Sequence, residues 1–149
     1  MKIYSENKKA GHNYEILEKF EAGISLIGPE VKSIKNGRIS ISGAYVLIKE
    51  KEAYLVGANI PPYQPANMPE NYNPQRDRKL LLTKKEIKYL IGKSQSKGIS
   101  LVPLKIYERN AKIKLEFGIG KGRKKYDKRE KIKKRESKKE IERKLKIWG

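Results

Sequence analysis

The sequence contains no cysteine, one histidine and one tryptophan. Without cysteine the chain has neither a disulfide framework nor a Cys-based zinc site, and a nucleophile–histidine pair would require Ser or Thr beside His12. No apolar run approaches the ~18 residues of a membrane span. The first nine residues, MKIYSENKK, lack the apolar core of a signal peptide. We therefore expect a cytoplasmic protein that is not an enzyme and that uses no metal or cofactor.

Acidic residues are scarce relative to basic ones. The chain carries 36 Lys and Arg against 17 Asp and Glu, which gives a formal net charge of +19. A solvated surface rich in Lys and Glu would explain many charges, but not this excess of cations. Such an excess points to a polyanionic partner, most often a nucleic acid. The length of 149 residues suits one domain of ordinary size.

The stretch at residues 118–129, GIGKGRKKYDKR, divides the chain into two parts. Glycine at every second position from Gly118 to Gly122 forfeits side-chain packing and permits close backbone approach to a ligand. The stretch is not a P-loop, because no Gly-Lys-Ser/Thr follows at the required spacing. We interpret it as the boundary between a globular domain at residues 1–120 and a basic C-terminal tail at residues 121–149.

The first 120 residues read as short strands joined by turns. A polar start at residues 1–11 is expected to be loosely held, and a turn is expected at residues 20–23. This pattern predicts a mainly β fold, an OB-fold-like antiparallel six-stranded barrel with about three short helices; an SH3-like barrel is the second option. The expected strands lie at residues 14–20, 24–26, 39–48, 53–58, 99–107 and 112–119, and two of the helices at residues 29–35 and 84–97. In the last strand Ile113, Leu115 and Phe117 alternate with charged residues, which predicts one apolar face. Thr83 and Glu86 predict a capping box at the start of the second helix.

Residues 60–78 contain five prolines and show no hydrophobic periodicity. Such a segment cannot continue a strand ladder, and a loop of this length is uncommon unless it is functional. Two interpretations are open. Either the loop is pinned across one end of the barrel by Tyr63 and Tyr72, or it contacts RNA directly.

The tail carries 15 Lys and Arg against 5 Asp and Glu. Its three favourable i,i+4 pairs contribute only ~0.2–0.5 kcal/mol each, which cannot offset ~1–2 kcal/mol of backbone ordering entropy per residue. We expect the tail to be disordered when free and helical when bound to a polyanion. The pairs are Glu130–Lys134, Glu140–Lys144 and Glu142–Lys146.

Several short motifs, taken in order along the chain, resemble the SsrA-binding protein (SmpB) family. No single motif is decisive, but the ordered set is specific and covers nearly the whole chain. The matching pieces are Asn7-Lys8-Lys9-Ala10 with His12 and Tyr14, Phe20-Glu21-Ala22-Gly23, Gly28 with Glu30-Val31-Lys32-Ser33, Tyr45-Val46, Ile60 with Pro62-Tyr63, Arg76 with residues 78–82, residues 101–104 with Tyr107, and Gly120-Lys121-Gly122 through Tyr126-Asp127-Lys128-Arg129.

The resemblance implies an OB-fold-like barrel that binds the tRNA-like domain of transfer-messenger RNA around its elbow. It implies delivery of this RNA to stalled ribosomes for trans-translation, with the protein standing in for the missing anticodon arm and its tail entering the empty mRNA channel of the small subunit. Elongation factor Tu and alanyl-tRNA synthetase would be indirect partners through the RNA. The resemblance implies no covalent catalysis, and we expect a monomer without a membrane partner.

The resemblance also implies roles for individual residues. Glu21 would accept hydrogen bonds from base or 2′-hydroxyl groups, Leu81 would pack on an unstacked base, and Lys114 would meet phosphate. The RNA-binding residues expected in this way are Glu21, Lys79, Leu81, Lys114, Lys121, Arg123 and Lys124. The residues expected to contact the ribosome and its decoding centre are His12, Asp127, Lys128, Arg129, Lys131, Lys134 and Trp148.

Two other functions are compatible with the composition. The first is a generic OB-type RNA-binding or ribosomal protein without preference for transfer-messenger RNA. The second is a membrane-surface module that uses the basic tail as an amphipathic helix, although the apolar face of that helix would be thin.

Overall fold

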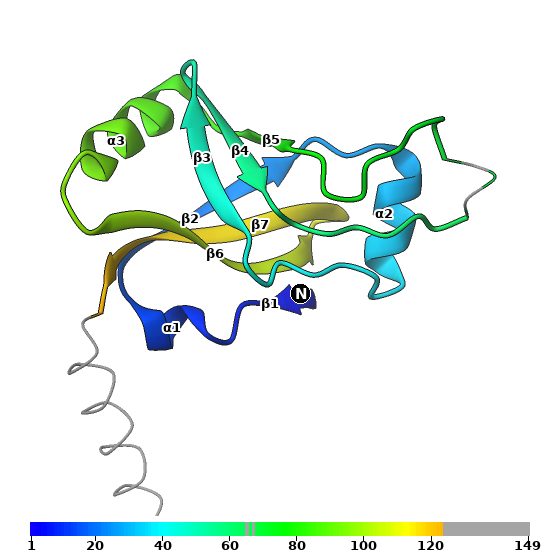
Figure 1. Ribbon diagram of the computed structural model, residues 1–149, viewed down its shortest axis with the longest axis horizontal. Helices are drawn as coiled ribbons and strands as arrows, with labels where there is room; N and C mark the ends of the chain where they lie inside the picture. Colours follow the sequence, from blue (N-terminus) through cyan, green and yellow to red (C-terminus); the bar gives the residue numbers. More distant parts are fainter. Residues whose placement is uncertain (65, 67, 124–149) are drawn as a thin grey trace, which may run out of the picture.

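The computed structural model describes residues 1–64, 66 and 68–123, drawn in colour in Figure 1. Within this part the chain forms seven strands and three helices. In chain order they are β1 (Lys2–Glu6), α1 (Ala10–Asn13), β2 (Tyr14–Ile24), α2 (Gly28–Lys35), β3 (Tyr45–Lys49), β4 (Glu52–Val56), β5 (Arg78–Leu81), α3 (Lys84–Ser94), β6 (Ile99–Arg109) and β7 (Lys112–Gly122).

All seven strands belong to one antiparallel sheet with the order β1-β6-β7-β2-β5-β4-β3. The long strands β2 and β6 each carry an irregularity in their pairing with β7, and such bulges bend a strand and increase its twist. The sheet curls until β3 lies beside β6, so that it forms a partly open barrel. The predicted mainly β, antiparallel, OB-like architecture is confirmed.

The sheet has seven strands rather than the expected six, and several local expectations are wrong. No separate strand forms at residues 24–26, and residues 39–44 make only an isolated bridge between Ser40 and Asn59 before β3 begins. Residues 1–11 are not loose at their start: β1 pairs with β6, and the Tyr4 hydroxyl donates a hydrogen bond to Glu108 over 3.2 Å. The expected turn at residues 20–23 does not form, because β2 runs unbroken to Ile24 between β7 and β5. Residues 78–81 form β5, a strand that the sequence did not predict, and its first residue belongs to the segment 60–78 that was expected to be loop.

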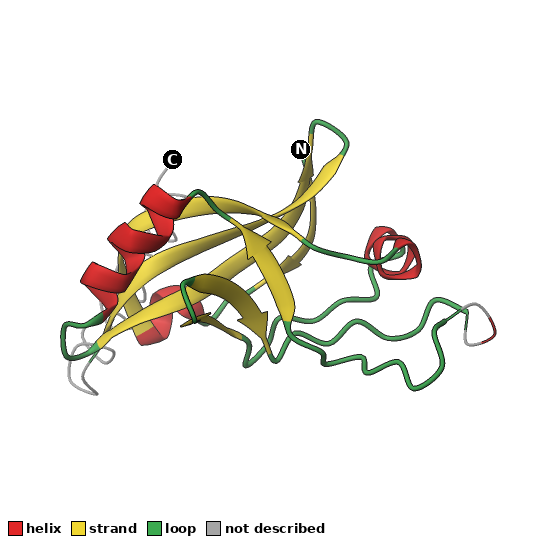
Figure 2. Ribbon diagram, turned by 90° about the horizontal axis from the view of Figure 1, so that it is seen from above, coloured by secondary structure: helices red, strands yellow, loops and turns green. Residues whose placement is uncertain are grey.

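The core lies inside the curled sheet and is closed at its ends by helices. In β7, Ile113, Leu115 and Phe117 are buried, as their alternation with polar residues predicts. Ile34 from α2 and Leu90 from α3 complete the apolar cluster. Figures 1 and 2 show α1 and α3 near one end of the sheet and α2 near the other. The two ends of the molecule are therefore built from different helices.

The two longer helices begin where the sequence predicts. Pro29 stands in the first turn of α2, and Glu30 accepts a hydrogen bond from the Ile27 amide. The predicted capping box of α3 is present: Thr83 accepts from the Glu86 amide over 3.1 Å, and the Glu86 carboxylate accepts from the Thr83 amide over 3.0 Å. The third helix, α1, has only four residues.

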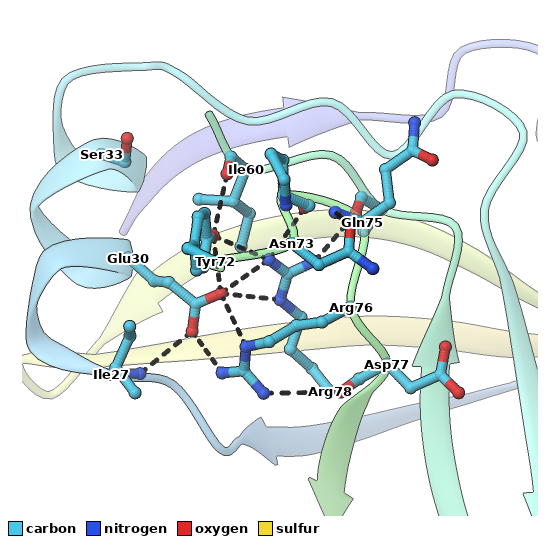
Figure 3. A network of polar contacts seen from close by, with 12 residues as sticks. Ile27, Glu30, Ser33, Ile60, Tyr72, Asn73, Gln75, Arg76, Asp77 and Arg78 are labelled. Carbon is cyan, nitrogen blue, oxygen red and sulfur yellow. Dashed lines mark hydrogen bonds and ion pairs between the residues drawn. The ribbon is translucent and has the colours of Figure 1, made fainter. Parts of the chain in front are cut away.

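Glu30 and Arg78 form a buried ion pair that joins α2 to the start of β5 (Figure 3). Both side chains are 0% exposed, and Nη2 of Arg78 lies 2.6 Å from Oε2 of Glu30. Arg76 makes a second ion pair with Glu30. Burial acts to raise the pKa of Glu30, but hydrogen bonds from Arg76, the Ile27 amide and Arg78 outweigh it and lower that pKa. Glu30 is thus held as a carboxylate in the interior.

Tyr72 fixes the proline-rich loop to the same cluster (Figure 3). Its hydroxyl oxygen lies 2.9 Å from the carbonyl oxygen of Ile60 and 3.0 Å from Oε2 of Glu30. Tyr63 contributes through its backbone: its carbonyl oxygen accepts a hydrogen bond of 3.4 Å from Nη1 of Arg38, which lies between α2 and β3. The first interpretation of residues 60–78, a loop pinned in place, therefore agrees with the structure at Tyr72.

Candidate RNA-binding surface

Gly23 is the centre of a surface on the outer side of the sheet. It pairs with Leu81 of β5 on one side and with Lys114 of β7 on the other. Directly paired residues point to the same face, and so do residues two apart on a strand, so Glu21 shares this face. We call the patch formed by Glu21, Gly23, Leu81 and Lys114 the Gly23 surface. The structure thus brings together the three residues whose RNA-binding roles rest most directly on the resemblance.

Leu81 is the most unusual member of the Gly23 surface because it is a large apolar side chain with 58% exposure. Leu81 can take up its position because the neighbouring Gly23 has no side chain: a Cβ atom on Gly23 would lie 3.3 Å from Cδ1 of Leu81. An exposed apolar side chain beside a cation suits contact with an unstacked base and its phosphate.

A groove of about 360 Å³ lies next to Leu81 and Lys114. Its lining combines apolar side chains, among them Leu26 and Val31, with the lysines Lys35, Lys112 and Lys114. Lys35 lies 3.6 Å from Glu108. Within the part of the chain that the structure describes, Lys112 and Lys114 form no ion pair. These two lysines are therefore available to an external anion.

Glu21 is held by two partners from β6. It accepts hydrogen bonds from the Tyr107 hydroxyl and, over 2.8 Å, from Nη1 of Arg109. Burial is the main cause that raises the pKa of Tyr107, and the hydrogen bond to the Glu21 carboxylate raises that pKa further. From the sequence, Tyr107 is only part of a matching motif, and Arg109 has no predicted role. Their spacing of two residues on one strand was the only available signal that they share a face.

Lys79 extends the Gly23 surface along β5, two residues before Leu81. Its Nζ atom lies 3.0 Å from Oε1 of Glu52, and the Tyr54 hydroxyl donates to the other oxygen of that carboxylate over 2.8 Å. Both partners of this ion pair are exposed, and such pairs contribute little to stability. A phosphate can therefore replace Glu52 as the partner of Lys79 at little expense to the fold.

His12, Lys121 and Arg123 gather at the opposite end of β2, which we call the α1 end. The Arg123 amide donates to the carbonyl oxygen of Asn13 over 2.9 Å, and Nε of the Arg123 side chain donates to the carbonyl oxygen of Gly11 over 3.3 Å. Arg123 thus ties the end of β7 to α1, which carries His12. Figure 1 shows α1 beside the point where the described chain ends.

The two surfaces stand at opposite ends of one strand. Tyr14 begins β2 at the α1 end, and Gly23 lies nine residues further along the same strand. At ~3.3 Å per residue, they are separated by up to about 30 Å. One small domain therefore presents two well-separated cationic regions that could contact different partners.

Gly118 and Gly120 of β7 serve protein packing rather than approach to a ligand, which corrects their interpretation from sequence, whereas Gly122 is exposed. Gly118 and Gly120 are buried. A Cβ atom on Gly118 would lie 2.7 Å from Cγ2 of Ile16, and one on Gly120 would lie 3.1 Å from Cβ of Tyr14. These two glycines are needed because side chains of both neighbouring strands, β2 and β6, lie against the backbone of β7 at these positions. The strand itself continues to Gly122.

Most of the expected ribosome contacts cannot be located in this structure. His12 alone among them is described. The other expected ribosome contacts lie outside the described residues: Asp127, Lys128, Arg129, Lys131, Lys134 and Trp148. The expected RNA-binding residue Lys124 also lies outside them. The predictions of a disordered free tail and of helical i,i+4 pairs fall on the same residues.

The described residues offer neither a metal site nor a membrane-spanning helix. Among the residues that the structure describes, no group of three or more His, Asp or Glu side chains is arranged to hold a metal ion. No helix in the described part is long and apolar enough to span a membrane.

The family model described as SmpB protein matches residues 4–147 of the chain. The chain is 44% identical over 146 residues to the SsrA-binding protein of Thermosynechococcus vestitus, covering 98% of this chain and 96% of that protein. It is 49% identical over 145 residues to the SsrA-binding protein of Acetivibrio thermocellus, covering 97% and 94% of the two chains. The matches therefore extend over nearly the full length of each protein.

A solved structure described as "tmRNA-SmpB: a journey to the center of the bacterial ribosome" is similar in fold and in sequence. It superposes with a TM-score of 0.65 at 44% identity, and the match covers 80% of this chain and 84% of that chain. Both the sheet topology and the sequence thus point to the same set of relatives.

Proposed function

The chain belongs to the SsrA-binding protein (SmpB) family, and we propose that it binds the tRNA-like domain of transfer-messenger RNA and delivers this RNA to stalled ribosomes for trans-translation. The observation that carries the proposal is the Gly23 surface, where the fold gathers Glu21, Leu81 and Lys114 on one exposed sheet face. Family membership favours this function over a generic OB-type RNA-binding protein.

The Gly23 surface is suited to RNA loops whose bases are unstacked. Lys114 contacts a phosphate, Leu81 packs against the face of a base, and the Glu21 carboxylate accepts a hydrogen bond from a base edge or a 2′-hydroxyl group. The elbow of a tRNA-like fold offers such bases. Lys79, Lys121 and the cations that follow β7, Arg123 and Lys124, add contacts to the sugar–phosphate backbone.

His12 at the α1 end and the tail are proposed to engage the ribosome, whereas Lys121 and Arg123 keep their contacts with transfer-messenger RNA. His12 stacks on a base of the decoding centre, and the tail beyond Arg123 enters the empty mRNA channel of the small subunit. Asp127, Lys128 and Arg129 support accommodation of the RNA, and three further tail residues contact ribosomal RNA: Lys131, Lys134 and Trp148. The division into a domain at residues 1–120 and a tail fits this role, because each part faces a different RNA.

The protein acts by binding and catalyses no covalent step of its own. It contacts elongation factor Tu and alanyl-tRNA synthetase only through the RNA that all three share. It works as a monomer in the cytoplasm. The protein replaces the anticodon arm that transfer-messenger RNA lacks, so its two surfaces bridge the RNA and the small subunit.

A reconstituted translation system tests this function directly. Ribosomes stalled on an mRNA without a stop codon are supplied with charged transfer-messenger RNA, elongation factor Tu and the protein, and addition of the peptide tag is measured. We expect tagging that depends on the protein. Efficient tagging in its absence would contradict the proposed function.

A further inference from the structure

Glu21 lies directly opposite another carboxylate, Glu116 of β7. Like charges that face each other across two strands are destabilising, so each of these carboxylates needs its own donors. Glu116 is met by Lys105 over 3.1 Å and by Lys19 over 3.6 Å. Glu21 is met by Arg109 and by the hydroxyl of Tyr107, as described above. The fold keeps two adjacent carboxylates apart by giving them separate partners.

The two partners of Glu21 both reach the same oxygen. The Tyr107 hydroxyl and Nη1 of Arg109 each donate to Oε2. No side chain or amide in the described part of the chain donates to Oε1 of Glu21. The Glu21 side chain is partly exposed, so Oε1 can be reached by an external donor. One oxygen of the carboxylate is therefore doubly held, and the other keeps its lone pairs free.

The holding groups are themselves fixed in place. Tyr107 is 2% exposed, so its ring has little freedom to move. The Arg109 guanidinium lies 5.4 Å from the centre of that ring, and the Lys105 ammonium lies 5.7 Å from it. Such cation–π contacts favour one arrangement of Arg109 over the ring. The two groups that donate to Oε2 are therefore held in position beside Glu21.

A carboxylate on a surface that binds RNA has a restricted choice of partners. It accepts hydrogen bonds but cannot donate them, and it is repelled by phosphate. The groups of RNA that can donate to it are 2′-hydroxyls and the amino or imino groups of bases. A free Oε1 with a fixed direction therefore selects a donor at one position of the RNA.

We propose that Tyr107 and Arg109 are positioning residues for Glu21, holding Oε2 so that Oε1 is presented to a hydrogen-bond donor of the bound RNA. This inference rests on the proposed function and adds to it the source of orientation at the Gly23 surface. Fixing a flexible side chain before binding reduces the entropy lost on binding, by an amount that corresponds to about 2- to 12-fold in affinity.

The test is a double-mutant cycle on binding of the tRNA-like domain. Tyr107→Phe keeps the ring and removes the donor, and Arg109→Gln keeps a polar side chain without the guanidinium. We expect each to weaken binding by about 2- to 12-fold when Glu21 is present, and by less than about 2-fold in a Glu21→Ala background. Equal losses in both backgrounds would overturn the proposal.

Salt dependence separates positioning from direct phosphate contact. If Arg109 contacted a phosphate, Arg109→Gln would reduce the slope of log affinity against log salt by about 0.7–0.9. We expect an unchanged slope. Tyr4→Phe is the matched control, since it removes a tyrosine–carboxylate hydrogen bond to Glu108 elsewhere on the sheet and should leave RNA affinity unchanged.

The results also distinguish this inference from the proposed function. If the wild-type protein shows no preference for the tRNA-like domain, the proposed function fails. If it shows the preference but Tyr107→Phe and Arg109→Gln bind like wild type, only the positioning role fails. Should Tyr107→Phe unfold, Arg109→Gln decides the matter alone, because Arg109 is exposed and its side chain lies outside the core.

Discussion

Leu81 and Lys114 lie on opposite sides of Gly23, each paired with it across one strand boundary. The pairing register of β2, β5 and β7 therefore places two side chains on one face. One is exposed and apolar, and the other is a cation that forms no ion pair within the described residues. Glu21 joins them two residues earlier on the central strand. This arrangement makes the sheet, rather than a loop, the support of the proposed RNA contact, and each of its members can be tested separately.

Lys114→Ala should weaken binding to the tRNA-like domain and reduce the slope of its salt dependence by about 1, because one phosphate contact is lost. Binding is measured by titration at several salt concentrations. Lys88→Ala, which removes an exposed lysine of α3, is the control and should change neither quantity. Unchanged affinity and slope for Lys114→Ala would exclude Lys114 as a phosphate contact.

Gly23→Ala should lower RNA affinity by about 2- to 12-fold, the effect of disturbing an apolar contact of ~0.5–1.5 kcal/mol. The new Cβ would lie 3.3 Å from Cδ1 of Leu81, which must shift away. The fold should persist, since Leu81 is exposed and can move. Gly92→Ala in α3 meets no atom within 4 Å and serves as the control, with RNA affinity retained. Wild-type affinity for Gly23→Ala would show that the position of Leu81 is unimportant.

Glu30 should make the protein sensitive to acid. Its pKa is lowered in the folded state, so its stabilising contribution is present above the unfolded value, ~4.3, and is lost as pH falls toward the folded value. Glu30→Gln leaves Arg78 buried without its ionic partner and should cost about 3–5 kcal/mol at neutral pH.

The measurement is the free energy of unfolding by denaturant between pH 7 and pH 3. The wild-type protein should lose stability more steeply over this range than Glu30→Gln does. Glu52→Gln, at an exposed ion pair, should be close to wild type at neutral pH. Parallel pH profiles for wild type and Glu30→Gln would contradict the assignment of acid sensitivity to this residue.

Replacing Asp127, Lys128 and Arg129 by alanine in the full-length chain should abolish tagging of stalled peptides while leaving most of the affinity for the tRNA-like domain. The reason is that the proposed RNA contact lies on the sheet, whereas the ribosomal contact lies in the tail. A chain ending after Arg123 keeps the link to Asn13 and should behave in the same way. Tagging that survives both changes would rule out the role of the tail.

Ala111→Gly should raise the free energy of unfolding by about 0.5–1 kcal/mol. Asn110 and Ala111 form the two-residue turn between β6 and β7, with φ values of 53° and 62°. Alanine is strained in this left-handed region by ~1–2 kcal/mol, part of which is offset by the greater flexibility of glycine in the unfolded chain. Gly98→Ala, at φ 81°, is the opposite change and should destabilise. A lower thermal midpoint for Ala111→Gly would contradict this account of the turn.

Local patterns in the sequence predicted the parts of the fold that local physics controls. The alternation of Ile113, Leu115 and Phe117 with charged residues gave the buried face of β7, because side chains of a strand alternate between its faces. The Thr83 and Glu86 signals gave the start of α3, because a capping box needs only four residues. In both cases the interacting groups are close in sequence.

The features that sequence reasoning missed depend on long-range pairing. Arg78 meets Glu30 from 48 residues away, and Arg109 meets Glu21 from 88 residues away. No spacing rule links such positions. The interpretation of Gly118 failed for the same reason, since the side chain that occupies the space beside it comes from β2.

The proposed function requires that this chain prefer the tRNA-like domain of transfer-messenger RNA to other folded RNA. Competition between that domain and bulk tRNA for the wild-type protein, at one fixed near-physiological salt concentration, tests it most directly. We predict that bulk tRNA in large molar excess fails to displace the tRNA-like domain. Equal competition by the two RNAs, mole for mole, would contradict the claim and leave only non-specific electrostatic binding.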